Sequence, residues 1–215
     1  ITQIGEILTL GGLEVEAIEY VRHRAEQLLL GKVVTLHEQD AQKSIYQVDC
    51  GGKTIKVAGP RALAEGSVVA IDVSSADAVV ADFAALGFSQ GTHEQIVVEP
   101  SYFPDALPAN LGQVKDFDDV IISLGITPNR ADALSHLGIS RELSALLDIN
   151  PRSPMLAPKE MAGPTHEKVA IEIENAEDCP RYACRIVENI AITASPLWLK
   201  LRLIVAGIRP INNVI

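Results

Sequence analysis

Residues 44–57 read Ser-Ile-Tyr-Gln-Val-Asp-Cys-Gly-Gly-Lys-Thr-Ile-Lys-Val, and this stretch decides the fold class of the chain. Side chains alternate along Ser44–Cys50 in the manner of a half-buried strand. Gly51-Gly52 is a hairpin-turn signal, and Thr54–Val57 returns as a second strand. The stretch therefore predicts an antiparallel β-hairpin.

Further short strands surround this hairpin. Lys32–Leu36, Ser67–Val73 and Ile96–Val98 are rich in β-branched and apolar residues. Short strands at this spacing are typical of a small barrel or sandwich. The segment Ala76–Leu86 is rich in alanine, and we expect it to form a short helix packed on that barrel.

A different pattern flanks the strand-rich region. Thr2–Leu10 carries apolar residues at helical spacing and is followed by two glycines that end a helix. Leu13–Ala17 alternates apolar and acidic residues, which predicts a strand, and Val120–Leu124 predicts a buried strand. A helical tract follows with Ile139 and Leu147 on one face. Together these segments indicate an α+β fold class.

The last third of the chain begins with a proline-rich stretch, residues 150–164, that predicts a linker. Lys168–Glu174 alternates strictly and predicts a strand. Ser195-Pro196 predicts a helix start, with the serine hydroxyl as a cap, and Gly207 predicts its end. Trp198 shares a face of this helix with apolar residues, so we expect it in the core.

The composition limits the partners of the chain. Its 215 residues suit one large or two modest domains, and its net charge of −10 disfavours strong nucleic-acid binding by bulk electrostatics. Any RNA contact is expected to be local or supported by a partner. Three cysteines suit a reducing, cytoplasmic location, and we find no secretory signal or apolar run long enough to cross a membrane.

Sequence motifs for phosphate binding or metal binding are weak in this chain. Gly52-Lys53-Thr54 has the end of a phosphate-binding loop, but the glycine required five positions earlier is Gln47, so a hairpin turn is favoured. Cys179, Cys184 and five scattered histidines lack the spacing of a zinc site. We therefore expect no catalytic residue and no metal site, and the sequence alone gives no RNA-binding residue.

Three aspartates, Asp116, Asp118 and Asp119, could hold a divalent cation through their carboxylates. The favoured alternative is that these aspartates are solvent-exposed residues in the segment that leads into the following strand. Two other segments are unusual. Thr127–Asp132 places Pro-Asn, an arginine and an aspartate ahead of a helix, and Gly207–Asn213 joins a glycine, an X-Pro and two asparagines. Capping with an Arg–Asp pair, and a loop held by asparagine side chains, are the favoured interpretations.

Several segments resemble the beta subunit of bacterial phenylalanyl-tRNA synthetase. They are, in order, Leu10–Glu16, Ile126–Ser135 with Gly138–Leu143, Cys179–Tyr182, Ser195–Leu199 and Gly207–Val214. Their order and spacing also match, so the chain is identified as an N-terminal fragment of a member of this family. The resemblance touches both ends and the middle of the chain.

The resemblance implies a specific α+β architecture. Residues 1–28 and 118–158 would form a split N-terminal α+β domain, and residues 29–117 an inserted oligonucleotide-binding (OB) barrel. Residues 159–215 would be a linker and the beginning of a B3/B4-type editing domain, which is truncated here. No editing residue is carried over.

The resemblance also implies the function. The whole enzyme would attach phenylalanine to tRNA(Phe) with ATP and Mg2+, and the chemistry would lie on the alpha subunit. This fragment would contribute tRNA contact and subunit docking without catalysis. The full assembly would be a cytoplasmic heterotetramer of two alpha and two beta chains.

Parts of the insert differ from the family pattern. His37–Ser44 stands where the family has a His-Pro-Asn-Ala-Asp-type loop, and Ala76–Gly91 where it has an Arg-Gly-Val-x-Ser-type motif. Basic and aromatic residues, through which OB barrels hold single strands, are few. They are Lys32, Lys43, Lys53, Lys56, Arg61 and Lys115, with Tyr46, Phe83, Phe88, Tyr102, Phe103 and Phe117. A barrel kept only as a spacer is therefore one alternative, a stand-alone OB-fold tRNA-binding module is another, and a metabolic enzyme with a diverged site is a third.

Overall fold

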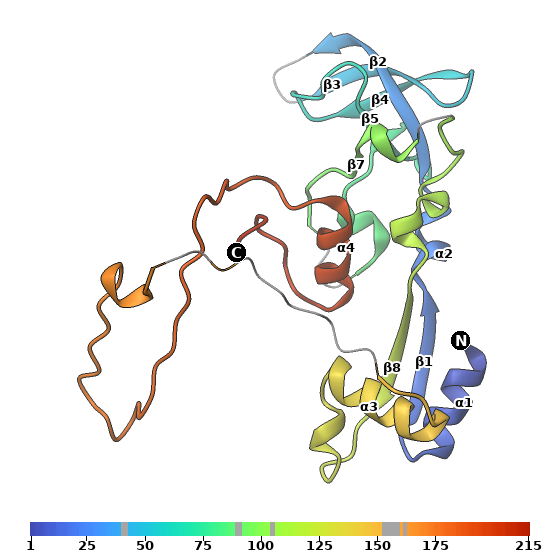
Figure 1. The fold of residues 1–215 in the computed structure, drawn as a ribbon. Helices are drawn as coiled ribbons and strands as arrows, with labels where there is room; N and C mark the ends of the chain where they lie inside the picture. The colour runs from blue at the N-terminus through green and yellow to red at the C-terminus, as the bar shows by residue number, and fades with distance from the viewer. Residues whose placement is uncertain (40–42, 89–91, 104–105, 152–159, 161–162) are drawn as a thin grey trace.

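The computed structural model describes residues 1–215 except 40–42, 89–91, 104–105, 152–159 and 161–162. A long two-stranded ribbon carries a β-barrel at one end and two helices at the other (Figure 1). The α-helices are α1 (Thr2–Leu10), α2 (Val21–Ala25), α3 (His136–Leu147) and α4 (Leu197–Val205). The strands are β1 (Glu14–Tyr20), β2 (Leu29–Gln39), β3 (Ser44–Asp49), β4 (Thr54–Gly59), β5 (Val68–Asp72), β6 (Val79–Val80), β7 (Val97–Val98) and β8 (Val120–Gly125).

The barrel is closed by five strands in the order β2-β3-β4-β6-β5, with β5 returning to β2. Its hairpin forms as predicted: β3 and β4 pair from Ser44↔Gly59 to Asp49↔Thr54. Tyr46 and Val48 alternate into the interior, because successive side chains of a strand point to opposite faces. The interior residues are Val33, Tyr46, Val48, Val57, Val69, Ile71 and Val80.

The expectation for Ala76–Leu86 is wrong. This segment holds β6 and a short 3-10 helix, η1 (Phe83–Leu86), which the Asp82 carboxylate caps by accepting from the Ala85 amide at 3.1 Å. β6 bonds β4 on one side and β5 on the other, so it closes the barrel. Ile96–Val98 does supply a strand, β7, which among the described strands pairs with β5 and lies outside the ring. Barrel closure thus outweighs the helical propensity of the alanines.

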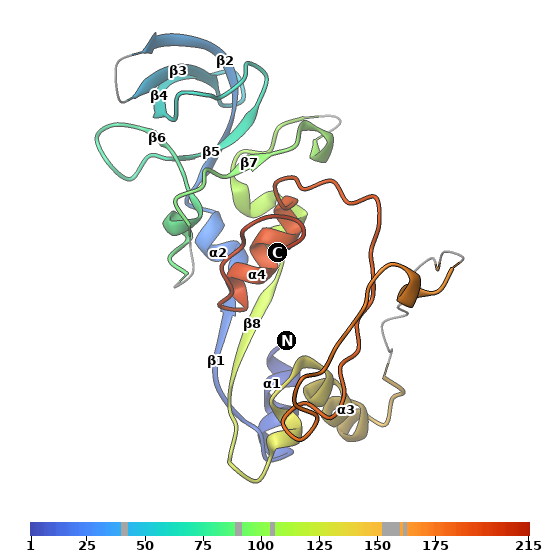
Figure 2. The ribbon, with the colours of Figure 1, turned by 90° about the vertical axis from the view of Figure 1, so that its left-hand side faces the viewer.

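The ribbon joins segments that are far apart in the sequence. β1 pairs antiparallel with β8, from Glu14↔Gly125 to Tyr20↔Val120. Strand β8 was expected to be buried, but all its residues are half-buried, because the ribbon has only two strands. At the far end, Leu8, Leu13 and Ala133 form a small core with partly buried residues of α3. Figure 2 shows α1 and α3 together at this end of the ribbon.

The main core lies between the barrel and the ribbon. It unites α2, the 3-10 helices η3 (Leu111–Gln113) and η4 (Lys115–Phe117), and α4. Leu201 and Ile204 of α4 are 2% and 1% exposed there, beside Phe117 at 0%. Trp198 was expected in this core, but it is 47% exposed because Leu197, Leu201 and Ile204 form the buried stripe instead.

The helix boundaries at α4 are close to those predicted. The helix begins after Pro196 and ends before Gly207, whose φ is +74°. The expected cap is absent, because the Ser195 hydroxyl is buried without a hydrogen-bond partner. The Lys168–Glu174 strand is also absent: the segment is exposed, and no described strand lies beside it to complete a ladder. Most of the predicted linker lies outside the described residues.

Candidate nucleic-acid interface

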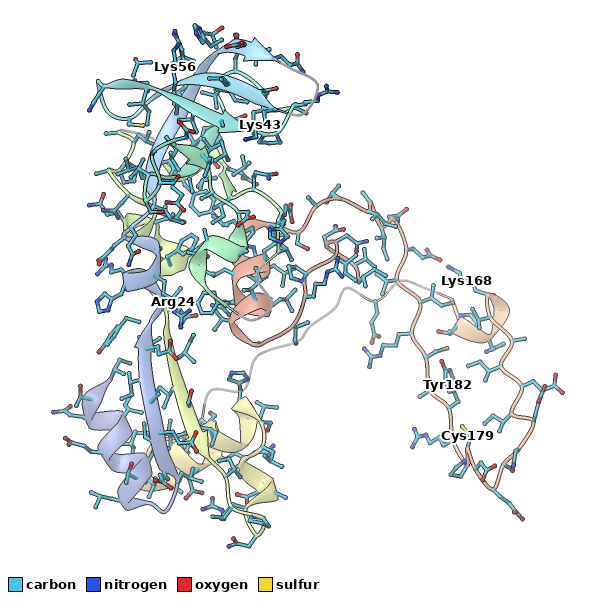
Figure 3. All side chains as sticks on the ribbon, turned by 180° about the vertical axis from the view of Figure 1, so that it is seen from behind. Arg24, Lys43, Lys56, Lys168, Cys179 and Tyr182 are labelled. Atoms are coloured by element: carbon cyan, nitrogen blue, oxygen red, sulfur yellow. The ribbon has the colours of Figure 1, made fainter. Side chains whose placement is uncertain are left out.

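The outer face of the barrel around the β3–β4 hairpin carries several exposed lysines. Lys56 on β4 pairs with Gln47 on β3, and both side chains point away from the interior that Tyr46 and Val57 fill. Lys32 lies on the neighbouring strand β2, and Lys43 lies at the start of the hairpin (Figure 3). These lysines are exposed, so they can approach a phosphate without unfolding the barrel.

The charge of this region differs from that of the rest of the chain. Residues 29–66 contain five Lys and Arg and four Asp and Glu, which gives +1 in a chain of −10. A surface with so small an excess of positive charge neutralises few phosphates, and the affinity for nucleic acid rises with the number of phosphates neutralised. The charge of this region therefore disfavours strong nucleic-acid binding by the barrel face.

The aromatic residues of the barrel region are used in packing. Tyr46, Phe83 and Phe117 are at most 2% exposed. Phe88, Tyr102 and Phe103 are half-buried and pack against the main core. The Tyr46 hydroxyl donates to the Pro60 carbonyl at 2.6 Å and accepts from the Leu63 amide at 3.3 Å. Three of these six rings are buried and the other three are partly covered by packing, so none is a fully exposed platform of the kind on which a base stacks.

The Gly51-Gly52 segment is a hairpin turn, as predicted, and not a phosphate loop. Both glycines have positive φ, 77° and 96°, and the Gly52 amide donates to the Asp49 carboxylate at 2.8 Å. The Cys50 amide donates to the Lys53 carbonyl at 2.9 Å and completes the turn. An anion at this position would face a carboxylate that already holds the backbone amide.

The three clustered aspartates act separately. Asp116 accepts from the Tyr102 hydroxyl at 2.8 Å, Asp118 lies 4.0 Å from the Arg22 guanidinium, and Asp119 accepts from the Val120 amide at 2.8 Å. Among the described residues, no three His, Cys, Asp or Glu side chains lie where they could share a metal ion.

The Tyr102–Asp116 bond links two 3-10 turns below the barrel. Burial, together with the bond to the Asp116 carboxylate, raises the pKa of Tyr102 to about 12. Since the pKa of an unfolded tyrosine is about 10, the bond stabilises the fold fully below pH 10 and is lost as the pH rises through 12.

We expect Tyr102→Phe to lower the free energy of unfolding by about 1 kcal/mol at pH 8, because Asp116 loses a partly buried donor. Between pH 10 and 12 the parent chain should lose more stability than the variant, so the two should converge. Urea unfolding followed by circular dichroism at several pH values measures this. A difference that stays constant up to pH 12 would contradict the assignment.

The turn before α3 holds its charges as predicted. Arg130 donates to both Asp132 oxygens at 3.2 and 3.1 Å and to Glu142 at 2.7 Å. The bidentate bond from Arg130 holds the pKa of Asp132 below its usual value. The Ser135 hydroxyl caps α3 by accepting from the Gly138 amide at 3.0 Å. The Arg130 guanidinium is therefore fully engaged in stabilising the turn before α3.

The two adjacent asparagines pin the end of the chain, also as predicted. The Asn213 side chain accepts from the Thr193 amide at 2.9 Å and donates to the Ala191 carbonyl at 3.0 Å. The Asn212 carboxamide oxygen accepts from the Val214 amide at 2.9 Å. Asn213 therefore holds the segment before α4 against the segment after it.

Comparison with known proteins identifies the family of the chain. The family model for the B3/4 domain matches residues 178–215. A phenylalanine–tRNA ligase beta subunit of Listeria monocytogenes is 31% identical over 241 aligned residues, and one of Anaeromyxobacter dehalogenans is 31% identical over 235. Each alignment covers 99% of this chain. The chain belongs to the bacterial phenylalanine–tRNA ligase beta-subunit family.

Within this family the chain corresponds to part of a longer protein. It spans 30% of the Listeria beta subunit and 29% of the Anaeromyxobacter beta subunit. The segments that resemble the family have structural roles. They form the turn held by Arg130 before α3, the start of α4, and the loop that Asn213 holds against Thr193 and Ala191. No described helix is both long and apolar enough to pass through a bilayer.

Proposed function

We propose that the chain is the N-terminal part of a beta subunit that positions tRNA and docks to other parts of a phenylalanine–tRNA ligase. The similarity to beta subunits along 99% of the chain carries this proposal. Joining phenylalanine to tRNA(Phe) with ATP and Mg2+ would take place on the alpha subunit. The described residues supply no metal-binding cluster for that reaction.

We also propose the domain arrangement. Residues 1–28 and 118–158 would be one split α+β domain, which the β1–β8 pairing and the shared core of α1 and α3 support. Residues 29–117 would be the inserted OB-like barrel. Residues 159–215 would be a linker and the beginning of the B3/B4-type domain, docked through α4 onto the core below the barrel.

For RNA, the barrel face would make a weak contact centred on Lys56. We expect the chain to bind tRNA only at low salt, with a small slope of log K against log salt, because few phosphates are neutralised. Lys56→Ala should reduce that slope by about 1. Fluorescence anisotropy with labelled tRNA at several salt concentrations measures both quantities.

The control is Lys168→Ala. Lys168 is also exposed, but it pairs with Glu188 far from the barrel (Figure 3). It should leave the slope unchanged. Equal effects of the two variants would contradict a contact at the barrel face. Tight binding by the chain at physiological salt would instead favour a stand-alone RNA-binding module.

For assembly, the full-length beta chain should co-purify with the matching alpha subunit as a cytoplasmic heterotetramer of two alpha and two beta chains. A full-length beta chain that forms no complex with alpha would overturn the ligase assignment. Because this experiment involves no RNA, it separates the family function from the weaker claim about the barrel face.

A further inference from the structure

A cavity of about 460 Å³ lies between the first turn of α4 and the segment around β7, which are neighbours in the fold (Figure 1). Small-molecule sites commonly measure roughly 300–1,000 Å³, so the cavity can hold a small ligand. Val97, Pro196 and Leu197 give it an apolar wall. Lys56, the centre of the proposed RNA contact, does not line it.

Lys200 of α4 brings a positive charge to this cavity. Its side chain is only 12% exposed, and its ammonium is paired with the carboxylate of Glu94. An ammonium has three N–H donors, and Glu94 is its only hydrogen-bond partner among the described residues. Because a lysine is seldom buried with unused donors, Lys200 indicates a place for a further acceptor.

The start of α4 strengthens this positive end of the cavity. The helix runs for nine residues from Leu197, and no side chain caps its first turn. The first amides of a helix lack helical partners and favour a negatively charged group. Ser195, just before the helix, also lines the cavity, is 4% exposed, and has a hydroxyl without a partner among the described residues. A ligand carboxylate would supply the acceptor that these donors lack.

Negative charge lines the same cavity. Glu94 and Glu99 both contribute to its wall, and both are exposed residues. A carboxylate has about four acceptor sites, so Glu94 can accept from a ligand while it is paired with Lys200. A simple anion would meet these two carboxylates, and a simple cation would meet Lys200, so each is disfavoured by a like charge. A ligand that carries both charges is favoured.

We propose that this cavity binds a small zwitterion with an apolar side chain, the chemical class of free amino acids. The ligand carboxylate contacts the Lys200 ammonium and the first turn of α4. The ligand ammonium contacts Glu94, and the apolar side chain lies against Val97 and Leu197. The site goes beyond the proposed function, because it involves neither RNA nor the joining of an amino acid to tRNA.

The test is a nuclear magnetic resonance titration of the isotopically labelled chain with L-leucine. Saturable shifts should appear at the amides of residues 94–99 and 196–200. Two probes that each lack one charge are titrated in parallel: 4-methylpentanoate, which has no ammonium, and 3-methylbutylamine, which has no carboxylate. Each should bind about tenfold more weakly than L-leucine or less, because one charged hydrogen bond is lost.

Two variants separate the two ends of the site. Glu94→Gln should weaken L-leucine binding about tenfold but should not weaken 4-methylpentanoate, which does not use Glu94. Lys200→Gln should weaken L-leucine by a similar factor but should not weaken 3-methylbutylamine. The matched control is Lys168→Gln, which removes another Lys–Glu pair, with Glu188, away from the cavity. It should leave all affinities unchanged.

The proposal is overturned if L-leucine gives no saturable shifts at residues 94–99 and 196–200. It is also overturned if the two single-charge probes bind as tightly as L-leucine, or if Glu94→Gln binds L-leucine like the parent. Glu94 is exposed, so Glu94→Gln decides the matter even if Lys200→Gln fails to fold.

Discussion

Replacing Gly138 with alanine is expected to destabilise the α1–α3 end of the molecule by about 3 kcal/mol or more. A Cβ built on Gly138 would lie 1.8 Å from the carbonyl oxygen of Asp132 and 2.9 Å from its carbonyl carbon. These atoms belong to the backbone and cannot rotate away, so the start of α3 must move. Overpacking of a fixed site commonly costs 1–3 kcal/mol, and a backbone clash stands at the upper end.

The movement should also break the charge arrangement in front of the helix. Gly138 lies in the first turn of α3, where its amide donates to the Ser135 cap, and Asp132 is held by Arg130. Hydrogen exchange across residues 131–145, with urea unfolding followed by circular dichroism, measures the effect. Faster exchange should be confined to this end of the ribbon.

Gly125→Ala is the matched control. A Cβ at Gly125 would approach the Glu16 carboxylate at 3.1 Å, and the end of that side chain can move aside. We expect a change of less than about 1 kcal/mol. If Gly138→Ala is no more harmful than this control, the close approach of α3 to residues 131–133 is wrong.

Leu201→Ala should have the second large effect, and it tests whether α4 belongs to the core below the barrel. Leu201 is 2% exposed in the cluster that contains Phe117 and Leu111. Truncating a buried leucine to alanine costs about 2–5 kcal/mol, because the transfer free energy is lost and a cavity remains. We expect a loss in this range, measured by urea unfolding, with faster exchange in η3 and η4.

The control lies on the same helix. Trp198 is the larger side chain, but 47% of it is exposed, so Trp198→Ala should cost less than Leu201→Ala despite removing more atoms. The opposite order would show that Trp198 is buried in the core, as the sequence predicted. Equal small effects of both variants would show that α4 does not pack on this core.

The sequence predicted much of the local structure. The spacing of apolar residues located α1 and α3, and the start and stop signals Ser195-Pro196 and Gly207 located α4. The alternation around Gly51-Gly52 located the β3–β4 hairpin, because these signals are contained within one element or at its ends. The Arg130–Asp132 pair could also be predicted, since the two residues are close neighbours in the sequence. Asn213 was expected to pin a loop through its carboxamide, but its distant partners Thr193 and Ala191 could not be named. The resemblance to beta subunits came from such local segments as well.

Contacts between segments that are far apart in the sequence could not be predicted from the sequence. The Ala-rich stretch around Val79 became the strand that closes the barrel because the edges of β4 and β5 required a partner. Conversely, Lys168–Glu174 alternates well but has no described strand beside it. The contacts of the Arg24 guanidinium with Leu86, Gly87 and Phe88 could not be predicted from the sequence, because these partners follow Arg24 by more than sixty positions.

The sequence by itself determined the class of elements, their order and the family of this chain, because periodicity, turn residues and short motifs depend on neighbours along the backbone. Only the tertiary structure decided which face of α4 is buried, which strand closes the barrel and whether aromatic rings are free to stack. Those outcomes depend on which unpaired backbone and apolar surfaces meet in space, and burial free energy is gained only at that meeting.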